Sequence, residues 1–267
     1  DAAQMQPIDS GGAFGMLANE RDDTPTLVDV RRFAAEWERD ASLRLRLGDE
    51  AVLQDYAEHD RIVSGGYEQM VEAAYAAWRA DVAAGRRSIL VTETLQAVTE
   101  LNERARYDRV TAGKVTAGGL RLHDGTTVGA GDLIITRNIE RRLTTGRGWV
   151  KNNDRWVVTA THLDGSLTAR RNTRRRVGWV RLPAWYVAAH VDLGYAVTVQ
   201  RAQGLTVDTS HALVASQAMT REALYVALTR GQHANIAYVA VDEAHLEEHQ
   251  RRPEHVMPDA LAVLNRI

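Results

Sequence analysis

The chain has 267 residues, of which 45% are hydrophobic and 25% charged, and its formal net charge is −2. These values are those of a globular protein of one or two domains, and no apolar run reaches the roughly 20 residues that span a bilayer. We expect no signal peptide, and the lack of cysteine excludes disulfides and thiolate metal sites. The nine histidines show no metal-ligand spacing, so we expect a cytoplasmic protein with no metal site and no membrane contact.

Helix and strand patterns alternate over the first part of the chain. Apolar spacing predicts helices over Phe33–Leu47, Tyr67–Ala84 and Thr94–Ala112. The short apolar run Ser88–Thr92 is typical of a buried parallel strand. This alternation predicts a parallel sheet flanked by helices.

Short strand-like runs follow from about Gly118. Asp124-Gly125 and Asp164-Gly165 are typical hairpin turns, whereas the turn at residues 152–154 lacks glycine and should be less tight. Short strands at close spacing predict a small antiparallel barrel inserted into the α/β domain. The predicted strands are Leu120–Leu122, Thr126–Val128, Leu133–Arg137, Arg155–Thr161, Ser166–Arg170 and Gly178–Leu182.

The α/β pattern returns after the insert. Pro183–His190 is predicted as a short helix, and Asp208–Val214 and Asn235–Val241 as strands. Thr220 is suited to cap a helix that has an arginine at its end, with Gly231 expected at the left-handed position that closes it.

Basic residues are concentrated in the insert. Between Thr116 and His190 there are 13 Lys and Arg against 5 Asp and Glu, a local charge of +8, so the rest of the chain carries −10. Such a segment favours contact with a polyanion, because neutralised phosphates release counterions; a solvated arginine-rich surface is the alternative. The insert's arginines include Arg137, Arg141, Arg142, Arg147, Arg170, Arg171, Arg174, Arg175, Arg176 and Arg181.

Five strings of the chain together resemble one family of enzymes. Gly194–Thr206 resembles motif V and Leu224–Arg230 resembles motif VI of superfamily 1B DNA helicases. Leu27–Phe33 is similar to motif IV, Asp1–Ala13 to a motif III without its glycine, and Gly131–Asn138 to the entry of the family's inserted barrel. The resemblance is greatest to the helicase part of MobF-family conjugative relaxases, whose relatives include the RecD-like helicases.

This resemblance implies a particular α/β architecture. A RecA-like parallel sheet with flanking helices would be interrupted by a small SH3-like antiparallel β-barrel. Residues 1–115 and 191–242 would form the second RecA-like domain, 116–190 the barrel, and 243–267 a C-terminal helical tail. The six tryptophans are predicted to serve mainly for packing, with at most one stacking on a base.

The resemblance also implies roles at a nucleotide. Arg230 would be the arginine finger that stabilises charge on the transferred phosphoryl group, and Arg32 a second γ-phosphate contact. Gln4, Gln203 and Gly204 match positions that couple the nucleotide to DNA. Three of these residues have a structural alternative. Arg230 could simply be an arginine favoured at a helix C-terminus, Arg32 could pair with a nearby acid, and Gln4 lies at a terminus.

Further matching positions are expected at DNA. Thr198, Gln200 and Arg201 of motif V are suited to contact the phosphate backbone, with Gln200 standing where relatives often have histidine. Thr92 ends a strand where family members contact DNA, and Arg174–Arg176 form a cationic loop in the insert. We therefore expect single-stranded DNA as a partner.

The chain contains no G-x-x-x-x-G-K-[ST] phosphate loop, so hydrolysis would need the N-terminal RecA-like domain of the same polypeptide. The resemblance implies that the full-length protein uses ATP and Mg²⁺, and that this segment alone binds neither and is inactive. The implied activity is ATP-dependent 5′-to-3′ DNA unwinding, in a conjugative relaxase that acts in plasmid transfer. The alternatives are a chromosomal RecD-like helicase and a vestigial module that binds single-stranded DNA without hydrolysing ATP.

Overall fold

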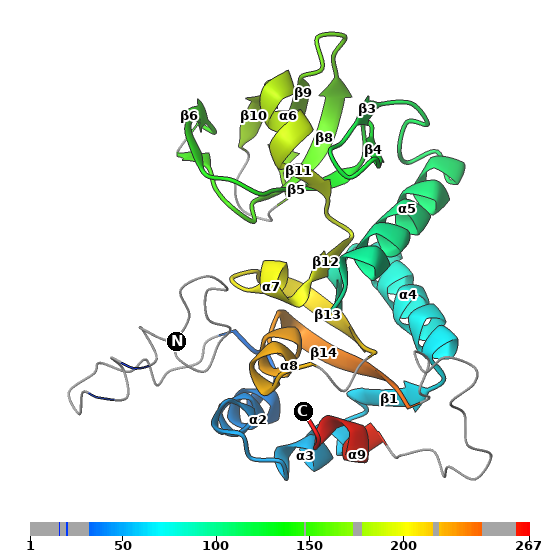
Figure 1. The fold of residues 1–267 in the computed structure, drawn as a ribbon, viewed down its shortest axis with the longest axis vertical. Coiled ribbons are helices and arrows are strands. Elements are labelled where there is room, and N and C mark those ends of the chain that lie inside the picture. The colour runs from blue at the N-terminus through cyan, green and yellow to red at the C-terminus, as the bar shows by residue number, and fades with distance from the viewer. Residues whose placement is uncertain are drawn as a thin grey trace. The chain divides into compact units, whose positions relative to one another are not determined.

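The computed structural model describes residues 16, 20, 32–146, 148–172, 178–215, 219–241 and 260–267. The chain divides into two compact units (Figure 1). Unit 1 is formed by Asp1–Glu93 and Thr198–Ile267, and unit 2 by Thr94–Val197. The chain therefore passes from one unit to the other at two points, after residue 93 and after residue 197.

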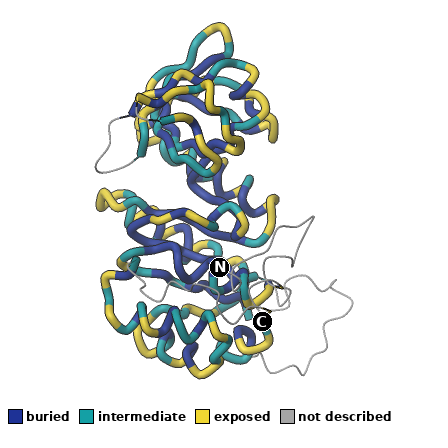
Figure 2. The backbone as a smooth tube through the Cα atoms, turned by 90° about the vertical axis from the view of Figure 1, so that its left-hand side faces the viewer, coloured by how far each residue is buried: buried dark blue, intermediate teal, exposed yellow. Residues whose placement is uncertain are grey.

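Unit 1 is built on a parallel sheet, which confirms the expectation from the βα alternation. Its strands are β1 (Ile62–Gly65), β2 (Ser88–Thr92), β13 (Val207–Val214) and β14 (Gly231–Ala240), with β12 (Ala196–Thr198) where the chain returns from unit 2. The order is β1-β14-β13-β2-β12, and the pairs β1–β14, β14–β13 and β13–β2 are parallel. Every residue of β2 and β13 is buried, as in a sheet covered on both faces (Figure 2).

The helices of unit 1 follow the predicted apolar stripes. Helix α4 buries Met70, Ala74, Tyr75 and Trp78, and it packs against β2, β13 and β14. Helix α2 ends at Gly48, whose φ of 78° is the left-handed conformation that glycine adopts readily. Neither α3 nor β1 was predicted. The helices are α2 (Glu36–Leu47), α3 (Val52–Glu58), α4 (Tyr67–Ala83), α7 (Val199–Ala202), α8 (Arg221–Ala227) and α9 (Ala260–Leu264).

The prediction for Gly231 is wrong. Thr220 does cap α8, since its hydroxyl accepts the Ala223 N–H at 3.3 Å, but Leu228 closes the helix and Gly231 begins β14. Gly231 is also not one of the glycines with a positive φ. Its lack of a side chain serves close packing, because a Cβ there would stand 2.1 Å from the Ala234 carbonyl oxygen.

Unit 2 contains the predicted antiparallel strands together with helix α5 (Leu95–Thr111). Its main sheet has the order β10-β9-β8-β5-β11, and two ribbons, β3–β4 and β6–β7, accompany it. The ribbon β6–β7 and the strand β11 were not predicted. The strands are β3 (Leu120–Arg121), β4 (Thr127–Val128), β5 (Leu133–Thr136), β6 (Glu140–Thr144), β7 (Trp149–Val150), β8 (Arg155–Thr161), β9 (Leu167–Arg171), β10 (Trp179–Leu182) and β11 (Val191–Leu193). The short helix α6 (Ala184–His190) completes the unit.

The turns of unit 2 follow from local chemistry. Asp124 and Asp164 each accept the backbone N–H two residues on, and Gly125 and Gly165 take φ values of 86° and 81°. In the turn without glycine, Asn153 itself adopts a φ of 63°, a left-handed conformation that asparagine tolerates.

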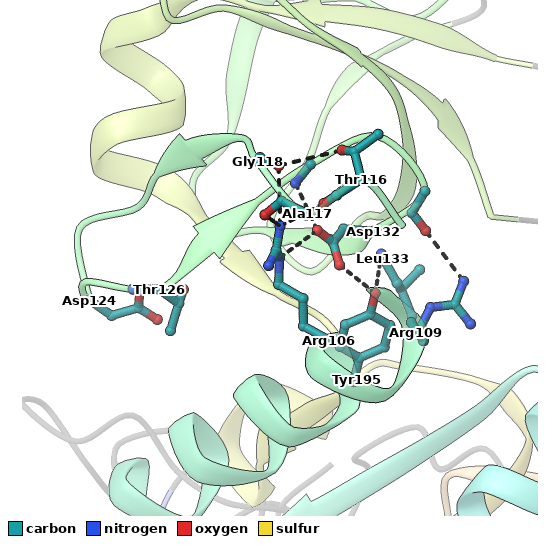
Figure 3. A network of polar contacts seen from close by, with 12 residues as sticks. Arg106, Arg109, Thr116, Ala117, Gly118, Asp124, Thr126, Asp132, Leu133 and Tyr195 are labelled. Carbon is teal, nitrogen blue, oxygen red and sulfur yellow. Dashed lines mark hydrogen bonds and ion pairs between the residues drawn. The ribbon is translucent and has the colours of Figure 1, made fainter. Parts of the chain in front are cut away.

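A buried polar network joins α5 to the chain segments that enter and leave the insert (Figure 3). The carboxylate of Asp132 is fully buried and accepts hydrogen bonds from Arg106 Nε at 3.0 Å, Tyr195 Oη at 2.6 Å and the Gly129 N–H at 2.7 Å. Arg106 Nη2 also donates to the carbonyls of residues 116, 117 and 118. Asn102 binds the backbone of Tyr195 and Ala196. Unit 2 is thus wider than the predicted insert, because α5 is hydrogen-bonded into it.

Candidate functional site

Two arginines from opposite ends of the chain meet at Thr229 in unit 1. Arg32 Nη1 donates to the Thr229 carbonyl, and Arg230 Nη2 donates to the Thr229 hydroxyl at 2.5 Å. Arg230 Nε donates to the Val226 carbonyl at 2.8 Å, in the last turn of α8. The structure thus brings together the two residues that the sequence predicted to act on the same phosphate.

The charge on this arginine pair is uncompensated within the described residues. Arg230 is 1% exposed, and its Nη1 has no hydrogen-bond partner among them. Burial, together with repulsion from Arg32, lowers the pKa of Arg230 to about 9. Burial also lowers the pKa of Arg32, against an opposing contribution from Tyr225.

An orphaned guanidinium N–H in a buried site is costly, and such groups are normally satisfied. The chemistry that would satisfy this pair is an anion with several acceptor oxygens, because a guanidinium presents its donors in a planar fork that suits phosphate. In the described conformation Arg230 is covered, so contact with an anion requires the covering groups to move.

Helix α7 carries the motif V positions and packs against α8. Thr198 caps α7, its hydroxyl accepting the Arg201 N–H at 3.4 Å. Gln203 follows the helix, and Gly204 has a φ of 85° with open space where a side chain would lie. The motif V turn therefore lies in the same unit as the arginine pair.

Comparisons with known proteins identify relatives of the chain. A family model described as an AAA domain matches residues 1–67. The conjugal transfer protein TraA of Rhizobium radiobacter is 32% identical over 234 residues, which cover 86% of this chain and 20% of that protein. TraA of Agrobacterium fabrum strain C58 is 32% identical over 235 residues, with the same coverage. The chain therefore spans about a fifth of the length of these curated relatives.

A solved structure shows the same fold. The Pif1 helicase from Bacteroides, crystallised with ADP-AlF3 and single-stranded DNA, aligns with a TM-score of 0.50 and 15% identity, over 95% of this chain and 63% of that one. The fold of this chain is thus the one seen in that helicase structure, and its sequence is similar to the conjugal transfer proteins.

One residue predicted to contact DNA, Thr92, lies at the far end of the sheet from Arg230. Thr92 ends β2, whereas Arg230 precedes the first residue of β14, and the parallel pairing places these positions at opposite ends of the strands. Thr92 and Thr198 are buried, Arg201 is half-buried and Gln200 is exposed. Gln4 and Arg174–Arg176 lie outside the described residues.

The tryptophan prediction is wrong in part. Trp78 and Trp156 are buried, but Trp149, Trp179 and Trp185 are among the exposed large side chains, at 39%, 52% and 54%. Arg141 and Lys151 lie over the Trp149 ring, 5.6 Å and 5.9 Å from its centroid. Trp149 therefore combines an exposed aromatic ring with two cations, the pairing that proteins use to hold single-stranded nucleic acid.

Two buried polar side chains of unit 1, Glu38 and Asn235, were not singled out from the sequence. No local signal identifies them, since the hydrogen bond between them joins residues 197 apart in the chain. No three His, Asp or Glu side chains converge as a metal site within the described ranges. The described helices include none that is long and apolar enough to cross a membrane.

Proposed function

We propose that this chain is the second motor half of an ATP-dependent 5′-to-3′ DNA helicase, in a conjugative relaxase that acts in plasmid DNA transfer. The observation that carries the proposal is the arginine pair, in which Arg230 presents a buried, unsatisfied N–H group beside the second cation Arg32. TraA proteins as relatives favour conjugative transfer over a chromosomal RecD-like role.

The nucleotide would be bound mainly by another domain. ATP and Mg²⁺ would be held by the N-terminal RecA-like domain, and this chain would supply Arg230 and Arg32 to the γ-phosphate. As the transferred phosphoryl group becomes more charged in the transition state, the guanidinium stabilises that charge without moving a proton. Approach of that domain would have to displace the groups that cover Arg230 in the described conformation. The isolated chain is expected to be inactive.

Single-stranded DNA is the proposed nucleic-acid partner. Exposed cations of unit 2, including Arg141 and Arg142, suit a phosphate backbone of any sequence, and Trp149 offers a face for a base. Among the motif V residues predicted to contact DNA, Gln200 is the exposed side chain. A vestigial module that binds DNA without hydrolysis is the rival, and kinetics separate the two.

The decisive test is Arg230→Ala in the longer polypeptide that includes the phosphate-loop domain. Turnover of ATP should fall roughly 10³-fold, with the Michaelis constant and DNA affinity little changed, because an arginine finger acts mainly in the transition state. Arg230→Lys should rescue poorly, since a point charge lacks the planar fork.

Arg221→Ala supplies the matched control, because Arg221 is an exposed arginine at the start of the same helix. Turnover within a few-fold of wild type in Arg230→Ala would make Arg230 a structural residue and remove the basis of the proposal. A wild-type protein without DNA-stimulated hydrolysis would support the vestigial alternative.

A further inference from the structure

Two fully buried polar side chains connect the segments that carry the arginine pair. Asn235 on β14 uses its amide to hold Gly231, accepting the Gly231 N–H at 2.6 Å and donating to the Gly231 carbonyl at 3.1 Å. The same Nδ2 group donates its other hydrogen to Glu38 Oε1 at 2.8 Å. Glu38 lies on α2, which begins four residues after Arg32.

These hydrogen bonds of Asn235 hold Gly231, the residue that follows Arg230, in place. Strand β14 carries one extra residue against β13 between Gly231 and Ala234, a bulge seen as a register shift. Bulges redirect the chain, and here the Asn235 amide closes the bulge onto Gly231. The direction in which the chain leaves Arg230 is therefore set by a side chain rather than by the sheet ladder alone.

Three contacts tie the Arg32 segment to the Arg230 segment at regular intervals. Arg32 Nη1 binds the carbonyl of Thr229, the Ala34 N–H donates to the carbonyl of residue 232 at 2.7 Å, and Glu38 accepts from Asn235. The partners at 229, 232 and 235 are three residues apart, so the contacts follow the chain on both sides of Arg230. Of the three, the Glu38 contact is made between two buried side chains.

We propose that Glu38 and Asn235 are positioning residues that hold Arg32 and Arg230 in register for the phosphate. The inference rests on the proposed function of the arginine pair. Neither residue touches the nucleotide; each acts through the backbone on both sides of the pair.

A purely stabilising role does not account for Glu38. Its Oε2 has no hydrogen-bond partner among the described residues, and burial raises its pKa, opposed by the hydrogen bond from Asn235. A buried carboxylate that is only half satisfied disfavours folding, and a hydrophobic residue of similar size is often neutral or stabilising in such a place. Replacing Glu38 should therefore affect function without lowering stability.

The test compares Glu38→Met, which removes the acceptor, with Glu38→Gln, which keeps an acceptor oxygen and removes the charge. Thermal unfolding of Glu38→Met should be unchanged or raised. Hydrogen exchange of the Arg230 Nε–H, measured by NMR on the nucleotide-free chain, should be about tenfold faster in Glu38→Met, because residues of one network are coupled. Glu38→Gln should retain the wild-type exchange rate.

In the longer polypeptide, Glu38→Met should lower kcat about 10- to 100-fold, since small misplacements of catalytic groups are costly, with KM for ATP within about threefold. Glu38→Gln should restore turnover. In the background of Arg32→Ala, Glu38→Met should lower kcat little further. The contact between Arg32 and the Thr229 carbonyl, which Glu38 is proposed to keep in register, is already lost in that background. If Glu38→Met fails to fold, Glu38→Asp withdraws the same acceptor while keeping the charge.

Wild-type exchange and turnover in Glu38→Met would overturn the positioning role. Equal losses in Glu38→Gln and Glu38→Met would overturn it as well, because the acceptor oxygen would then be irrelevant. If Arg230→Ala leaves turnover intact, the proposed function fails. The exchange rates of the Arg230 Nε–H in the Glu38 variants still decide whether the Glu38–Asn235 hydrogen bond orders Arg230.

Discussion

Each unit holds an arginine with little exposed surface, but the two units treat its charge in opposite ways. In unit 2, Arg106 is paired with the buried carboxylate of Asp132 and donates to three carbonyls (Figure 3). In unit 1, Arg230 faces a second arginine, has no carboxylate beside it among the described residues, and keeps one N–H group unsatisfied.

The difference separates a structural arginine from one suited to a ligand. The Arg106 network is complete within the chain, so removing a member leaves a buried partner uncompensated. The Arg230 site is incomplete, and an incoming anion would supply the missing acceptor. Burial alone does not distinguish the two residues; the count of acceptors and the sign of the nearest charge do.

The largest expected effect on stability is at the complete network. Arg106→Met should destabilise unit 2 by about 3–5 kcal/mol, because Asp132 would remain buried without its cation. Denaturant unfolding followed by tryptophan fluorescence would measure this, since Trp156 is buried in unit 2. Arg106→Lys should recover part of the loss, as it keeps the charge but lacks the fork that reaches three carbonyls. A loss below about 1 kcal/mol in Arg106→Met would place the network among weak surface pairs.

Unit 2 also offers a test of its proposed DNA surface. Trp149→Ala should weaken binding of a single-stranded oligonucleotide by about 1–3 kcal/mol, measured by fluorescence anisotropy. Arg141→Ala should instead flatten the slope of log affinity against log salt by about 0.7, because one phosphate contact is lost.

Trp185 is the matched control, being more exposed than Trp149 but with its ring beside Tyr186 and His190 rather than under two cations. Equal losses of DNA affinity in Trp149→Ala and Trp185→Ala would point to a general hydrophobic effect. Trp149 would then have no specific part in the proposed DNA surface.

The smallest effect is expected at the incomplete site. Arg230→Met should stabilise the isolated chain by about 1 kcal/mol, because it replaces a buried, uncompensated cation with an unbranched apolar side chain. The folded-state pKa of about 9 lies below the ordinary 12.5, so the charged form is disfavoured by folding. The cost is complete below pH 9 and declines as the pH rises above that value.

The stability difference between Arg230→Met and wild type should therefore be constant from about pH 6 to 8 and shrink above about pH 9. Thermal unfolding across this range checks both sign and window. A strongly destabilised Arg230→Met would mean that the two cations are compensated in solution, which contradicts the contrast with Arg106.

Local patterns predicted much of the fold. The stripe of α4, the buried run of β2, the Thr220 cap and the aspartate-glycine turns all depend on neighbours within a few residues, and the structure has each of them. Gly231 shows the limit of such reasoning, since a glycine after a helix is typical of a left-handed cap, whereas here the need for glycine comes from the nearby Ala234 carbonyl.

The sequence alone determined the alternation that gives unit 1 its parallel sheet, and the motif strings that single out Arg32 and Arg230. Only the tertiary structure decided that these arginines share Thr229, that Glu38 meets Asn235, and that Arg106 is neutralised by Asp132. The physical reason is that propensity and periodicity act over a few residues, whereas the compensation of a buried charge depends on which distant groups the sheet register brings within hydrogen-bond distance. Arg32 and Thr229 are 197 residues apart in the chain, and no local pattern specifies that contact.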